Sequence, residues 1–145
     1  MSIFLLDVNL LLALCDPHHV HHEAAHHWFE PRGQRDWATC PLTENGFVRV
    51  ASQPAYPSSP GGPAVVRDLL IKFCTHPHHH FWPDDITWRD ENIFHPATTL
   101  TPGQVTDVYL LGLAAQHGGK LATLDRRIPV SMVKQGSAAL ELLAG

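Results

Sequence analysis

The stretch Ile3-Phe4-Leu5-Leu6-Asp7-Val8-Asn9 decides the expected fold. Its continuous apolar run predicts a short buried strand over residues 2–6. Asp7 follows at once, and Asp is a preferred residue for the position before a helix, so we expect it to cap a helix that ends before Asp16-Pro17. A strand that passes directly into a helix favours a parallel sheet.

The same alternation continues along the chain. Strands are predicted at 37–40, 79–82 and 120–124, and helices at 21–29, 43–52, 64–75 and 101–117, with a further short helix within 84–94. Thr43 is expected to cap its helix, and Thr101-Pro102-Gly103-Gln104 has the cap, the proline and the glutamine of a strong helix start. Gly118-Gly119 should end that helix, and the Pro-, Ser- and Gly-rich stretch 53–63 predicts a loop. This order predicts an α/β protein, a three-layer α/β/α fold with a central, mainly parallel sheet.

Size and composition restrict the class of protein. The 145 residues predict a single domain over 1–145, and 44% hydrophobic against 17% charged residues favours a globular chain. No apolar run has the length of a membrane span, and no secretory signal is evident. The three cysteines, Cys15, Cys40 and Cys74, are an odd number without CxxC spacing, which argues against a disulfide framework and a zinc ribbon. We expect a cytoplasmic location, and we interpret all three as small core residues.

Four acidic residues are the candidates for chemistry: Asp7, Glu44, Asp107 and Asp125. Asp7 and Asp125 each follow a predicted strand, whereas Glu44 and Asp107 lie near predicted helix starts. In a parallel sheet with right-handed crossovers these positions share one edge, where ligands bind. We therefore expect four carboxylates in one cleft.

Such a group needs a cation. Two carboxylates about 4 Å apart repel by roughly 4 kcal/mol at an effective dielectric near 20. Mg²⁺ or Mn²⁺ removes the conflict because hard cations prefer oxygen ligands, and a water on the ion can attack a phosphodiester. The net charge of −4 argues against a large basic surface for nucleic acid but is compatible with an acidic nuclease site.

Neighbouring polar residues complete the predicted site. Asn9 and Thr123 are candidates for orienting carboxylates or waters from behind, and Asn45 is a weaker one. Candidates for contacts with a nucleic-acid backbone are Arg49, Lys120, Arg126 and Arg127. Each acid alone also has an ordinary structural explanation, as a cap, a helix-dipole partner, a turn residue or a solvated side chain, so the joint pattern carries the prediction.

The motifs resemble the PIN-domain ribonucleases, and within them the VapC-type toxins of type II toxin–antitoxin systems. Leu5-Leu6-Asp7-Val8-Asn9-Leu10-Leu11 is similar to the first motif of that family, and Thr43-Glu44-Asn45-Gly46-Phe47-Val48-Arg49-Val50 to the acidic helix of one subgroup. Asp107 matches the third acid, and Thr123-Leu124-Asp125-Arg126-Arg127 the terminal motif. The resemblance covers residues 2 to about 130.

The resemblance implies a Mg²⁺-dependent endoribonuclease. Asp7, Asp107 and Asp125 would bind the metal, and Glu44 would complete the acidic set and help to position or deprotonate the attacking water. It also implies a homodimer and a cognate antitoxin that inserts a segment into the cleft. The Pro-rich loop and the histidine clusters lie outside the family motifs.

Two other functions stay open from the residues alone. An Asp-based phosphatase or phosphotransferase would use Asp7 as its nucleophile, although Asp7-Val8-Asn9 lacks a second Asp two residues on. A non-cleaving PIN-like module would bind RNA or protein without turnover, and the presence of all four acids argues against it.

Twelve histidines fall mainly into two clusters, one at 18–27 and one at 76–80. His22 and His26 have the i, i+4 spacing of helical metal ligands. Without an HExxH pattern the signal is weak, and we expect most of these side chains to be solvated.

Overall fold

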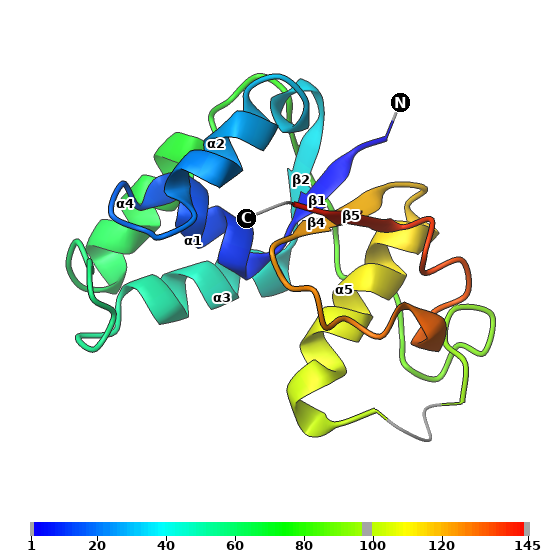
Figure 1. Cartoon of the computed structure of the whole chain (residues 1–145). Helices are drawn as coiled ribbons and strands as arrows, with labels where there is room; N and C mark the ends of the chain where they lie inside the picture. The colour runs from blue at the N-terminus through cyan, green and yellow to red at the C-terminus, as the bar shows by residue number, and fades with distance from the viewer. Residues whose placement is uncertain (1, 97–99, 144–145) are drawn as a thin grey trace.

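Five short parallel strands form the centre of the part of the chain that is described, residues 2–96 and 100–143 of a computed structural model. The sheet order is β3-β2-β1-β4-β5 (Figure 1). The strands are β1 (Phe4–Leu6), β2 (Trp37–Thr39), β3 (His79–Phe81), β4 (Lys120–Thr123) and β5 (Leu140–Leu142). Every pairing between them is parallel.

Helices cover both faces of this sheet. One face carries α1 (Val8–Cys15), α2 (His22–Phe29), α3 (Pro41–Ala51) and α4 (Pro63–Phe73), and the other carries α5 (Val105–Gln116) (Figure 1). Alternation along β1 divides the core accordingly, because Phe4 and Leu6 pack on the first side and Leu5 on the second. The predicted three-layer α/β/α fold is confirmed.

The strand order reverses between β1 and β4. The chain runs outward through β1, β2 and β3, then returns through α5 to place β4 on the other side of β1. Parallel sheets bind ligands beyond the carboxyl ends of their strands at such a reversal. Asp7 and Asp125 follow the two strands that meet there, so the topology directs both to this position.

Local capping signals place several helix ends as predicted. The backbone N–H of Val8 donates to Asp7 Oδ1 at 2.7 Å, which confirms Asp7 as the cap of α1. Thr101 and Gln104 form the expected capping box, although a 3₁₀ turn over Pro102–Gln104 precedes α5. Gly118 lies just beyond α5 with φ of 68°, a conformation that glycine adopts without a Cβ penalty.

The start of α3 differs from the prediction. Cys40 is the cap, Pro41 is the first helical residue and Thr43 is the third, within the first turn of the helix. The Thr43 hydroxyl accepts from the backbone N–H of Cys40 at 3.0 Å and is buried. The expectation of Thr43 as cap was wrong because Pro41 already fits the first helical position, where no N–H is needed.

Two features after β3 also differ from the prediction. The short helix expected within 84–94 is wrong: the segment forms turns, one of them closed by a hydrogen bond from Asn92 N to Asp90 Oδ1. Its end is held against α5, where a Cβ on Gly112 would lie 2.8 Å from the Phe94 ring. Strand β5 was not predicted, because three residues are too few for a period-two pattern.

The described chain contains no helix long and apolar enough to cross a membrane. Its three cysteines are free: Cys40 is buried, whereas Cys15 and Cys74 are partly buried against the core under α1–α4.

Candidate active site

Three of the four predicted acids come together beyond the carboxyl ends of β1 and β4. Asp7 follows β1, Asp125 lies two residues after β4, and Asp107 lies in the first turn of α5. Asp107 lies close enough to Asp7 and Asp125 for each of them to raise its pKa. We call Asp7, Asp107 and Asp125 the aspartate group.

The hydroxyl of Thr123 holds this group together from behind. It donates to Asp7 Oδ2 at 2.8 Å and accepts from the Asp125 backbone N–H at 3.0 Å. Asn9 Nδ2 donates to the same hydroxyl at 3.2 Å, while Asn9 Oδ1 accepts from the Leu124 N–H. Asn9 and Thr123 thus contact the aspartates from the protein side, which is the arrangement needed for the orienting role predicted for them.

Burial and mutual repulsion set the electrostatics. Asp7 is only 4% exposed, and burial raises its pKa above the ordinary range against the opposing hydrogen bonds from Thr123 and Val8. Burial, followed by the charges of Asp7 and Asp125, raises the pKa of Asp107 to about 6. The carboxylates therefore repel one another at neutral pH, and a bound cation would relieve this cost.

The donor set fits a hard divalent ion. All three groups offer carboxylate oxygens, which suit Mg²⁺ and Mn²⁺ rather than a thiophilic metal. A cationic side chain, that of Arg127, adjoins this group: its Nε lies 3.5 Å from Asp125 Oδ1, while most of the side chain remains exposed. Arg127 lowers the pKa of Asp107, but less than burial and the two aspartates raise it.

The predicted RNA-contacting residues divide into two groups. Arg126 and Arg127 are exposed in the turn after Asp125, beside the aspartate group, and Arg49 is exposed on α3. Lys120 is the first residue of β4, so it lies at the amino ends of the strands, opposite to the aspartates at the carboxyl ends. There its charge lowers the pKa of Glu141. We therefore withdraw Lys120 from the predicted RNA surface, because a strand separates it from the aspartates.

Glu44 does not join the aspartate group in this structure. Its Oε2 accepts a 2.7 Å hydrogen bond from the Thr39 hydroxyl, and its charge acts on Cys74 and His79. Thr39 shares the α1–α4 face of the sheet with Trp37, since residues two apart in a strand point to one side. Of the four carboxylates expected in one cleft, three come together and Glu44 does not. Asn45, the weaker candidate for an orienting role, is exposed beside Glu44.

The grouping of Thr39, Cys74 and His79 around Glu44 was missed from the sequence. Cys74 was interpreted as a core residue and His79 as solvated, and no local spacing connects either of them with Glu44. Only the pairing of β2 with β3 and the end of α4 bring them together.

The histidines of α2 have structural contacts instead. His22 Nδ1 lies 2.8 Å from the Ala13 carbonyl and His26 Nε2 lies 3.0 Å from that of Leu14, so both contact the last carbonyls of α1. Free carbonyls at a helix end need such partners.

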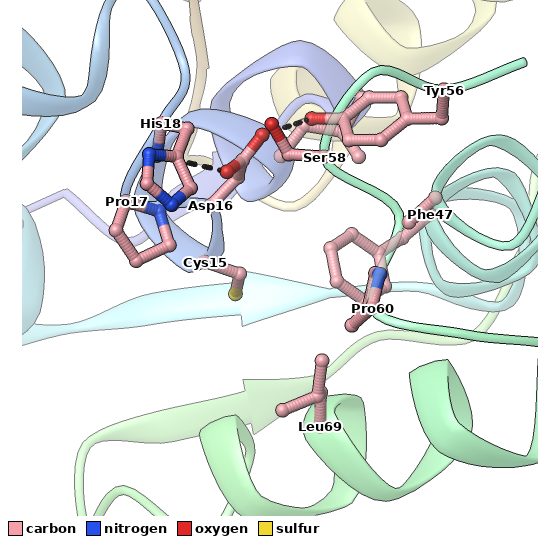
Figure 2. A pocket seen from close by; sticks show the side chains of 11 residues that line it. Cys15, Asp16, Pro17, His18, Phe47, Tyr56, Ser58, Pro60 and Leu69 are labelled. Atoms are coloured by element: carbon pink, nitrogen blue, oxygen red, sulfur yellow. Dashed lines mark hydrogen bonds between the residues drawn. The ribbon is translucent and has the colours of Figure 1, made fainter.

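A separate cavity of about 100 Å³ lies where α1 ends, between the loop at 56–60 and Leu69 of α4 (Figure 2). In Figure 2 the Tyr56 hydroxyl points to Asp16, to which it donates at 2.8 Å. None of the four predicted acids lines this mostly apolar cavity, which lies at the far end of α1 from Asp7. The Tyr56–Asp16 bond joins the Pro-rich loop to α1 and does not belong to the candidate active site.

Fold and site together define the class of protein: a three-layer, parallel-sheet domain of PIN-like fold with aspartates at the reversal of strand order. A crystal structure of VapBC2 from Rickettsia felis, bound to a DNA fragment from its promoter, shares this fold, with a TM-score of 0.58 over 98% of this chain and 99% of that one at 14% identity. No family model matches the sequence.

Relatives identify the family within that class. Ribonuclease VapC44 of Mycobacterium tuberculosis is 45% identical over 129 residues, covering 89% of this chain and 90% of the relative. Ribonuclease VapC39 is 40% identical over 121 residues (83% and 87%), and VapC38 is 38% identical over 141 residues (96% of both), each from the same organism. The chain belongs to the VapC ribonuclease family.

Proposed function

We propose that this chain, as one PIN domain over residues 1–145, is a Mg²⁺-dependent endoribonuclease and the toxin of a toxin–antitoxin pair. The observation that carries the proposal is the aspartate group at the β1–β4 reversal, in a chain whose relatives are named as ribonucleases. Asp7, Asp107 and Asp125 would hold Mg²⁺, or Mn²⁺ in its place. Bound there, the ion would neutralise phosphate charge and acidify a water molecule.

The residues of the chain have distinct tasks in this proposal. Thr123 and the Val8 N–H fix the two oxygens of Asp7, so that carboxylate keeps one orientation. Arg126 and Arg127 lie exposed beside the aspartates and are placed to meet RNA phosphates, with exposed Arg49 as a further candidate. These contacts would position the scissile phosphate without reading its sequence.

Glu44 is proposed as the group that accepts a proton from the attacking water. Its carboxylate is bonded to Thr39 on the α1–α4 side, so this role requires a rotamer that leaves Thr39. The task is assigned to Glu44 because the aspartates would be occupied as ligands.

The geometry of Asp7 does not favour the phosphatase alternative. A nucleophilic carboxylate needs an accessible oxygen, whereas Asp7 is almost fully buried and both its oxygens accept hydrogen bonds. Such a carboxylate suits a metal ligand held from behind.

Cleavage of RNA in Mg²⁺ or Mn²⁺ tests the proposal, with EDTA and Asp7→Asn as controls. We expect EDTA to abolish cleavage and Asp7→Asn to reduce it by more than about 100-fold, beyond the usual effect of losing an outer partner of a metal ligand. Undiminished cleavage by Asp7→Asn would reject the metal site. RNA binding without turnover in any divalent metal would support the non-cleaving module instead.

The partners are proposed on surface properties. Val65, Leu69 and Ile71 of α4 are large apolar side chains with substantial exposure, which favours burial against protein. We propose a homodimer and a cognate antitoxin, acting in the cytoplasm, where free cysteines persist. Light scattering of the purified chain tests the dimer, and rescue of growth by co-expression of the neighbouring small reading frame tests the antitoxin.

A further inference from the structure

Glu44, Cys74 and His79 form a compact set of metal-ligand side chains apart from the aspartate group. One potential ligand atom from each lies within 4.8 Å of the other two. Glu44 comes from the first turn of α3, Cys74 is the residue that ends α4, and His79 begins β3. All three are partly buried, so the set is held in place and still open to small ions.

Thr39 supports this set from β2. Its hydroxyl donates to Glu44 Oε2 at 2.7 Å and lies 2.7 Å from His79 Nε2. The Trp37 ring packs against that of His79 with centroids 4.7 Å apart, which limits the orientations of the imidazole. Metal ligands commonly have such hydrogen-bonded and packed neighbours, because these hold the donor atoms in position.

The chemistry of the donors selects a different ion from that of the aspartates. Thiolate and imidazole with one carboxylate are the ligands that Zn²⁺ takes in proteins, whereas Mg²⁺ requires oxygen donors. Three protein ligands leave a fourth tetrahedral position for water.

We propose that Glu44, Cys74 and His79 bind a zinc-class transition-metal ion. A carboxylate oxygen, Sγ and an imidazole nitrogen would be the ligands, and the Cys74 thiol releases its proton to solvent as the sulfur–metal bond forms. Thr39 would remain bonded to the carboxylate. The ion would join α3, the end of α4 and β3, three segments that no disulfide connects.

Titration of the reduced, metal-free protein with Co²⁺ and then Zn²⁺ tests the site directly. We expect one equivalent of Co²⁺ to give a thiolate-to-cobalt charge-transfer band that Zn²⁺ abolishes. Cys74→Ser should remove the band, and His79→Gln should weaken Zn²⁺ binding by at least about tenfold. The readout needs no nuclease activity, so it stands or falls separately from the proposed ribonuclease.

Matched controls separate this site from the other ligands of the chain. Cys15→Ser removes a second partly buried thiol from the same core and should keep the band. Asp125→Asn should also keep it, because the aspartate group lies elsewhere. His22→Gln addresses the α2 cluster and should leave one tight equivalent of Zn²⁺.

Two outcomes would overturn the proposal. One is a band that persists in Cys74→Ser but disappears in Cys15→Ser. The other is Zn²⁺ binding that depends on His22 and not on His79. Thermal melts of the metal-free variants show whether each is folded. If Cys74→Ser does not fold, the rise in Tm that Zn²⁺ gives is compared between wild type and His79→Gln. An equal rise in both proteins would reject the site.

Discussion

The Thr123 hydroxyl donates a 2.8 Å hydrogen bond to Asp7 Oδ2 and so joins the ends of two neighbouring strands, β4 and β1. The hydroxyl oxygen of Thr123 also accepts hydrogen bonds from the side-chain amide of Asn9 and from the backbone N–H of Asp125. Thr123 and Asp7 are both buried, so water is a poor substitute partner for the bond between them. One side chain thereby sets the relative positions of two of the three aspartates.

Replacing Thr123 with valine should damage stability and activity together. The change keeps the shape but leaves buried polar groups without their partner, at a cost of about 1–3 kcal/mol. We expect RNA cleavage to fall about 10–100-fold, as for other residues that orient metal ligands. Thermal melts and cleavage rates measure both effects. Thr123→Ser keeps the hydroxyl and should retain most of the activity. Thr106→Val, at an exposed position of α5, should change stability and cleavage little. Equal effects of the two valine variants would contradict the role of the Thr123 hydroxyl.

The stability of the metal-free protein should depend on pH through Asp107. Its pKa is raised to about 6 from an ordinary 3.8, so the folded state binds the proton more tightly than the unfolded state. This group therefore destabilises the fold above about pH 6, and the penalty is removed as pH falls through 6 toward 4. We expect Asp107→Asn to melt about 2–4 °C above wild type at pH 8. This corresponds to a gain of about 1 kcal/mol in the free energy of unfolding, a small value because the site is half-exposed and solvent screens the repulsion.

Melting curves of both proteins in EDTA between pH 8 and pH 4 measure this difference. It should fall to roughly half at pH 5, where only the folded wild type has Asp107 protonated, and shrink toward zero near pH 4, where the unfolded state takes up the proton as well. Mg²⁺ should stabilise wild type at pH 8 more than Asp107→Asn, since the variant loses a ligand. A large loss of stability in metal-free Asp107→Asn would argue against repulsion within the aspartate group.

Arg127 and Lys120 offer a matched pair for RNA binding. Arg127 is exposed beside Asp125, whereas Lys120 lies at the opposite edge of the sheet. Arg127→Ala should raise KM for RNA and reduce the slope of log affinity against log salt by about 1, as expected for one lost phosphate contact. Lys120→Ala should do neither, and a stronger effect of Lys120→Ala would place RNA on another surface.

Zinc should inhibit Mg²⁺-dependent cleavage if both proposed sites exist. An ion bound by Cys74 and His79 would hold Glu44 on the α1–α4 face, away from the aspartates, and so remove the proposed proton acceptor. We expect Cys74→Ser to cleave RNA at the wild-type rate in Mg²⁺ and to resist low concentrations of Zn²⁺. Equal inhibition of Cys74→Ser, Cys15→Ser and wild type would mean that Zn²⁺ acts at the aspartate group instead.

Local sequence predicted much of the fold but not all of the site. Asp7 as a cap, the turn at Gly118 and the alternation of strands with helices depend on neighbours in the chain, so their signals lie within a few residues. The segment 84–94 and the short β5 take their conformation from contacts with α5 and β4. Such contacts override weak local preferences, which is why a helix was wrongly predicted within 84–94 and β5 was not predicted at all.

The sequence by itself determined the class of fold and the identity of the aspartates, because strands that pass into helices carry their end residues to one sheet edge. Tertiary structure alone decided which acids meet there. Side chains alternate between the faces of a strand, and this alternation places Thr39, with Glu44 bonded to it, under α1–α4. Cys74 and His79 therefore become neighbours of Glu44 only once the sheet has formed.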